Sequence, residues 1–100
     1  MTREQLLALC GRIADHFNLN DWLLRFSIEE APGDDPNAWG HCTVIYGRKV
    51  AYIAISEAVL DRDLETAKHV IVHELIHVHI NAVRESMRQL MEPLKGRRIP

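Results

Sequence analysis

Three residues within one apolar segment carry the chemistry that this sequence most clearly offers. His73, Glu74 and His77 form the pattern H-E-x-x-H inside residues 70–80. Residues four apart on an α-helix project from one face, roughly 5 to 6 Å apart at Cβ, so both imidazoles can reach one zinc ion at about 2.0 to 2.1 Å. Glu74 is turned by about 100° from His73 and flanks such a metal rather than binding it. The pattern therefore predicts zinc bound by His73 and His77.

The chemistry expected of this trio is hydrolysis. Zinc lowers the pKa of bound water toward about 7, and a neighbouring carboxylate can accept the proton as the water attacks a carbonyl carbon. The same carboxyl group can then protonate the leaving amine. We therefore predict that Glu74 is the general base.

The elements that must position these residues can be read from the spacing of apolar side chains. Residues 3–17 repeat apolar positions at helical spacing behind Thr2, a residue type that caps helices, and residues 18–21 end this helix. Residues 22–29 alternate as a strand does, and residues 31–37 form a loop rich in Pro and Gly. Residues 38–46 and 50–56 form a hairpin around the turn at 47–49.

A long helix follows the hairpin and carries the motif. Ser56 or Asp61 can start helical structure, and from Asp63 the apolar residues fall three or four positions apart. Helical propensity continues through Met91, and Pro93 is expected to end the helix, which leaves residues 93–100 as a tail. The predicted fold class is α+β: an N-terminal helix, a small three-stranded sheet, mixed or antiparallel, and a long helix. Residues 1–100 form a single domain in this interpretation, which a further C-terminal segment could complete.

Composition and charge argue against several classes of protein. The formal net charge of -2 provides no global basic field for nucleic acid or an anionic membrane, and the short basic run at residues 95–98 is typical of a solvated tail. No stretch of about 18 apolar residues could cross a bilayer, and the N-terminus has no secretory signal. Cys10 and Cys42 form no C-x-x-C pair, so we expect free thiols in a reducing, cytoplasmic compartment.

The order of helix, strand, hairpin and a helix bearing residues 70–77 as V-I-V-H-E-L-I-H resembles the zincin metallopeptidases, in particular the small gluzincin-like and SprT-like members and short phage-type proteins. The resemblance extends from about Leu6 to Ile80, although only the motif is specific. It implies that His73 and His77 bind Zn²⁺ and that Glu74 acts as general base and acid. It also implies that an edge strand of the sheet, supplied by the hairpin, binds an extended substrate.

The family pattern includes a third protein ligand, usually a Glu or His on a later helix or loop, and here the sequence leaves the choice open. Glu85 lies about 12 Å beyond His77 along a straight helix and Glu92 about 22 Å, so neither reaches the metal unless the helix turns back near Asn81. A residue of a missing C-terminal segment or of a partner chain is the alternative. His69 is expected on the surface or beside the ligands, because three successive imidazoles at this spacing fit poorly around one tetrahedral ion.

These observations predict a zinc-dependent metallopeptidase that acts on a peptide or an unfolded protein segment. A non-catalytic zincin-like module for binding or assembly is the alternative from a different class, and the open third ligand favours it. His41 could line the cleft, although packing is the plainer interpretation, and His79 points away from the motif face.

Overall fold

The computed structural model describes residues 1–45 and 47–96, with side chains described as far as Met91. Its fold is α+β, as predicted, with an N-terminal helix, a three-stranded mixed sheet and a long C-terminal helix. The elements in chain order are α1 (Arg3–Ala14), β1 (Leu23–Glu29), the 3-10 turn η1 (Pro32–Asp34), β2 (Gly40–Ile45), β3 (Val50–Ser56), the 3-10 turn η2 (Glu57–Asp61) and α2 (Leu64–Gly96).

Helix α1 begins with a capping box. The backbone N–H of Gln5 donates to the Thr2 hydroxyl oxygen at 3.1 Å, and the N–H of Thr2 donates to the Gln5 side chain at 2.9 Å. Two N–H groups that the helix itself cannot satisfy thus find partners. The helix buries Leu6 and Cys10 and ends at Ala14, three residues earlier than its apolar pattern predicted.

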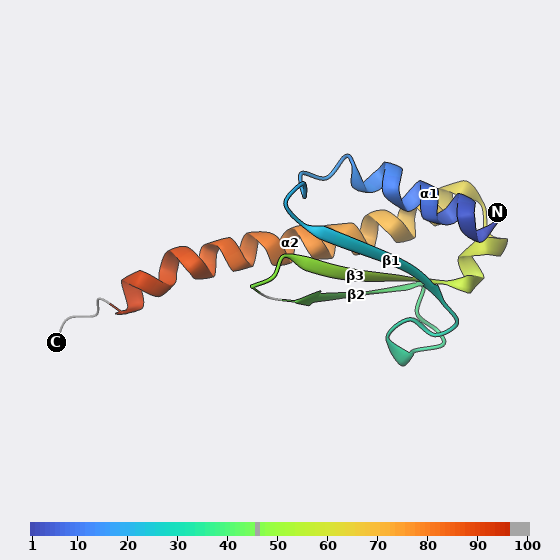
Figure 1. Cartoon of the computed structure of the whole chain (residues 1–100). Helices are drawn as coiled ribbons and strands as arrows, with labels where there is room; N and C mark the ends of the chain where they lie inside the picture. Colours follow the sequence, from blue (N-terminus) through green and yellow to red (C-terminus); the bar gives the residue numbers. More distant parts are fainter. Residues whose placement is uncertain (46, 97–100) are drawn as a thin grey trace.

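The sheet places the last strand of the sequence in the middle. Its order is β1-β3-β2, with β1 parallel to β3 and β2 antiparallel to β3, so the sheet is mixed (Figure 1). The two predicted strands of the hairpin are confirmed, and Gly47 and Lys49 in the turn take positive φ angles of 82° and 54°. Both β1 and β2 are therefore edge strands, and β2 is the one beside the motif helix.

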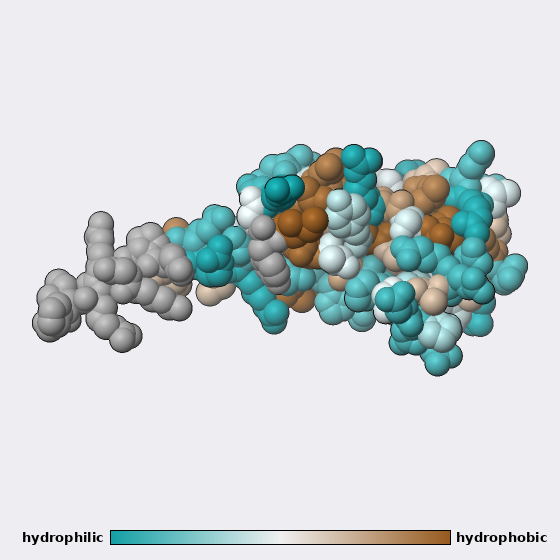
Figure 2. All heavy atoms as spheres, turned by 60° about the horizontal axis from the view of Figure 1, so that its bottom comes forward, coloured by the Kyte–Doolittle hydropathy of each residue, from teal (hydrophilic) through white to brown (hydrophobic). Residues whose placement is uncertain are grey.

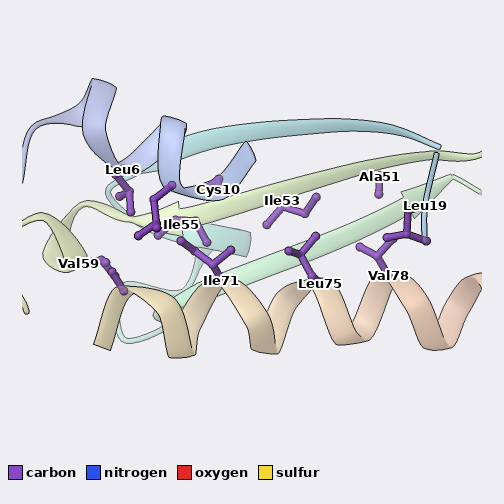
Figure 3. Close-up of a cluster of buried hydrophobic side chains, with 12 residues drawn as sticks. Leu6, Cys10, Leu19, Ala51, Ile53, Ile55, Val59, Ile71, Leu75 and Val78 are labelled. Carbon is purple, nitrogen blue, oxygen red and sulfur yellow. The ribbon is translucent and has the colours of Figure 1, made fainter. Parts of the chain in front are cut away.

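Both helices pack on one face of this sheet. Strand alternation sends Phe26, Ile53 and Cys42, which are aligned across the three strands, toward the helices. Figure 3 shows the resulting core between the sheet and α2, where Ile53 and Ile55 of β3 meet the motif helix. Its fully buried members from α2 are Ala67, Ile71, Leu75 and Val78. This core fixes which face of α2 turns away from the sheet.

Helix α2 begins at a cap made by Asp63. The backbone N–H of Thr66 donates to the Asp63 carboxylate at 3.0 Å. Hydrogen bonds from the Thr66 side chain and N–H hold the pKa of Asp63 below its ordinary value. Ser56 caps the preceding η2 turn instead, because its hydroxyl accepts from the N–H of Ala58.

The expected end of α2 at Pro93 is wrong, because the helix continues to Gly96. Proline lacks one N–H and so removes a single backbone hydrogen bond, while the residues after it can still bond to the carbonyls of the preceding turn. Residues 97–100, the rest of the expected tail, lie outside the described part of the chain. The C-terminal half of α2 projects beyond the sheet (Figure 1). Among the described residues, no helix is both long and apolar enough to cross a membrane.

Candidate metal centre

His73 and His77 lie one turn apart on the exposed side of α2, and their rings face each other. The two Nε2 atoms are 3.2 Å apart, and the rings meet edge to face, with centroids 4.8 Å apart and an angle of 80° between their planes. Leu75 and Val78 on the opposite side are fully buried against the core. The apolar residues within the motif therefore anchor the turn that presents the two imidazoles.

The separation of the two nitrogens tests whether one zinc ion fits between them. Two ligands of a tetrahedral ion, each about 2.0 to 2.1 Å from it, stand about 3.3 Å apart. The observed 3.2 Å agrees with this value. The same distance also suits a hydrogen bond between the two imidazoles. The observed geometry therefore fits two zinc ligands, but it can also form in the absence of a metal ion.

Glu74 lies between this pair and the sheet. The residue is only 6% exposed, whereas both histidines are exposed. It packs on the backbone of Gly40, the first residue of β2, so closely that a Cβ built there would lie 2.9 Å from Glu74 Cγ and 3.0 Å from Oε2. The Glu74 carboxylate thus occupies the space that a side chain at position 40 would fill.

A cleft of about 320 Å³ joins the trio to the start of β2. It is lined by Gly40, His41, Cys42, His73, Glu74, His77 and Asn81. Burial, with a smaller contribution from the Glu74 carboxylate, raises the pKa of the Cys42 thiol to about 11, so this wall of the cleft is a neutral thiol. The Asn81 side-chain amide donates to the His77 carbonyl oxygen at 2.9 Å. The cleft thus lies between the motif helix and an edge strand.

A second hollow of about 330 Å³ continues the cleft toward the start of α2. Trp39 and His69 line it together with the motif residues, and the Arg62 guanidinium lies 5.2 Å from the centre of the Trp39 ring. His69 therefore borders the site. The ring of His41 rests on Gly33, where a Cβ would come within 2.6 Å of its Nδ1, so His41 both packs and lines the cleft.

The described side chains contain no group of three or more His, Cys, Asp or Glu placed to hold a metal. α2 does not break near Asn81, so Glu85 stays on the same rigid helix and lines a separate hollow beside Trp22. Its carboxylate accepts two hydrogen bonds from Arg88, at 2.8 and 3.1 Å, which lower its pKa. The side chain of Glu92 lies outside the described residues.

Three residues of the site were not predicted from the sequence: Gly40 and Cys42 on β2 and Asn81 on α2. Gly40 and Cys42 lie on the face of β2 that packs against α2, two positions apart, as strand alternation requires. The alternation itself was visible in the sequence, but only the docking of β2 on the motif helix shows which side chain they meet.

In comparisons with protein-family models, with curated proteins and with solved structures, no match is found for this chain. The resemblance to the zincins thus stays a prediction that depends on the motif and its setting.

Proposed function

We propose that this protein is a zinc-dependent metallopeptidase that cleaves an extended peptide or unfolded protein segment. One arrangement carries the proposal. The Nε2 atoms of His73 and His77 are spaced as two zinc ligands would be, and the Glu74 carboxylate lies between this imidazole pair and the edge strand β2. His73 and His77 would hold the ion, with a third ligand from outside the described side chains. A zinc ion held there would supply a Lewis acid and lower the pKa of water.

The residues of the chain supply the proton transfers and the positioning. Glu74, held by its packing on Gly40, accepts a proton from the attacking water and returns it to the leaving amine. The position of β2 suits substrate binding, because β3 is its only partner among the described strands and one edge of its backbone stays open to an added strand. A peptide lying along β2 would pass the cleft that Glu74 lines.

The alternative is a non-catalytic module of the same architecture that serves binding or assembly. The observation that favours it is the lack of a third ligand among the described side chains. A zinc ion with two protein ligands binds more weakly than one with three, so this alternative predicts low zinc occupancy and no turnover.

We also propose a reducing, cytoplasmic compartment for this protein. Both cysteines are free thiols, Cys10 buried and Cys42 half-buried. Their thiol forms are favoured, with pKa values of about 12 and about 11.

Zinc content and hydrolysis of unfolded casein, measured side by side for four proteins, test the proposal. The wild type and the control His79→Ala, which removes an exposed histidine outside the cleft, should bind zinc and cleave casein. His77→Ala should lose both properties, and Glu74→Gln should keep zinc while turnover falls by about 10² or more. Bound zinc with turnover that does not depend on Glu74 refutes the enzymatic role, and the lack of any zinc binding refutes the zinc-dependent peptidase and any non-catalytic module that holds a structural zinc.

A further inference from the structure

Helix α2 carries a row of exposed apolar side chains that the sheet does not cover, and its last three members, Val83, Met87 and Leu90, border the hollow beside Trp22. Their exposed fractions are large for apolar residues, from 42% at Ile80 to 74% at Leu90. The members of this row, called the free stripe below, are Ile76, Ile80, Val83, Met87 and Leu90. The buried residues of the same helix, such as Leu75 and Val78, lie on the other side. The helix therefore has two apolar faces, of which the fold covers one.

The spacing within the free stripe is that of a two-stranded coiled coil. Its members follow one another at intervals of four, three, four and three residues, which is the heptad pattern of one helix packing along another. Such a row keeps facing a parallel or antiparallel partner helix over two heptads, about 21 Å of helix. Packing against the body of a globular partner would instead require a broader apolar face, with apolar residues repeating every 3.6 positions.

We propose that the free stripe is the interface through which two copies of this chain associate. The five residues expose on the order of 500 Å² per chain, about two thirds of the roughly 800 Å² that each partner contributes to a standard interface, an area that suits a weak dimer. The stripe contains no charged residue, so an identical stripe meets it without burying an unpaired charge. In a two-fold dimer, the part of α2 that projects beyond the sheet would pack against the same part of the second copy. A helical segment without such packing is only marginally stable in water.

The proposed interface begins within the motif, at Ile76, which lines a hollow with His73, and extends away from the metal centre toward Leu90. The pairing itself needs no metal. A dimer bridged by shared zinc would instead dissociate on chelation. The measurement in chelator therefore separates this proposal from the proposed function.

Sedimentation equilibrium of the full chain in EDTA, at about 100 µM, where a weak specific complex is populated, tests the proposal. The wild type and Gln89→Lys should be dimeric, because Gln89 lies next to Leu90 in the sequence but outside the stripe. Leu90→Lys and Met87→Lys should each weaken the dimer by about tenfold or more, because each pairing would bury an unpaired ammonium group. Circular dichroism should show that all of the variants stay folded, since both side chains are exposed in the single chain, and any loss of helix in Leu90→Lys and Met87→Lys should be limited to the projecting part of α2.

Two results overturn the proposal. One is a wild-type protein that sediments as a monomer in EDTA at this concentration. The other is a dimer that Leu90→Lys and Gln89→Lys affect equally, because the interface would then lie elsewhere, for example on the apolar residues Leu23, Ile45 and Tyr52 that the sheet leaves exposed. Figure 2 shows that hydrophobic residues, in brown, are also exposed on the compact part of the molecule.

Discussion

The change of Gly40 to alanine tests how the carboxylate of Glu74 is positioned. The new Cβ would stand 2.9 Å from Glu74 Cγ and 3.0 Å from Oε2, whereas ordinary contacts begin at 3.4 Å. Glu74 must therefore move by about half an ångström. Because a displacement of about 1 Å can cost 10² in rate, we expect kcat for casein to fall about tenfold. Overpacking at a buried contact should also cost about 1 to 3 kcal/mol in the free energy of unfolding.

The stability effect can be traced to this one contact by urea unfolding in two backgrounds. Glu74→Ala removes every Glu74 atom that the new Cβ would meet, so Gly40→Ala should cost little when the two changes are combined. The difference between the backgrounds should be about 1 to 3 kcal/mol. Zinc binding should survive in Gly40→Ala, since the close contacts of the new Cβ are with Glu74.

Gly11→Ala is the matched control for this experiment. A Cβ there meets nothing within 4 Å, and the residue lies inside α1, so the change should stabilise the fold by about 1 kcal/mol and leave kcat unchanged. Wild-type activity and stability in Gly40→Ala would refute the reasoning. An equal loss of stability from Gly40→Ala in the wild type and in the Glu74→Ala background would refute it as well.

Three further predictions concern the fold around the site. Leu75→Ala should lower the free energy of unfolding by about 2 to 5 kcal/mol because Leu75 is fully buried. Leu64→Ala, at a position that is 49% exposed, should lower it far less. Urea titration measures the free energy of unfolding of both variants. The pKa of Asp63 is lowered in the folded protein, so its carboxylate stabilises the fold at pH values above its unfolded pKa. This stabilisation is lost as the pH falls through the folded pKa. The melting temperatures of wild type and Asp63→Asn should therefore converge below about pH 4. The raised pKa values of Cys10 and Cys42 predict slow alkylation of both thiols by iodoacetamide at about pH 8 and rapid alkylation in urea; fast labelling of the folded protein would contradict their burial.

The sequence predicted the elements well because each has a local signature. Thr2 and Gln5 form the cap that starts α1, and alternation of Leu24, Phe26 and Ile28 marks β1. The turn at 47–49 joins the two strands of the hairpin, as its residues indicated. These signals arise within a few residues of one another, so no distant contact is needed to read them.

The arrangement of the strands and of the site could not be predicted in the same way. The parallel pairing of β1 with β3 joins residues 27 positions apart, such as Phe26 and Ile53, and no local pattern distinguishes it from an antiparallel sheet. The contact of Gly40 with Glu74 likewise depends on how β2 docks on α2. The spacing of His73 and His77, in contrast, was fixed by a single helical turn and was predictable.

The position of β3 in the sheet also has a consequence for how the chain folds during synthesis. β3 is the last strand to be made, yet it is the only described strand that pairs with either β1 or β2. Until residues 50–56 have left the ribosome, both earlier strands have unpaired edges that can aggregate or attract chaperones. Substitutions that weaken β3 should therefore reduce the yield of newly made protein more than equal losses of stability in α1.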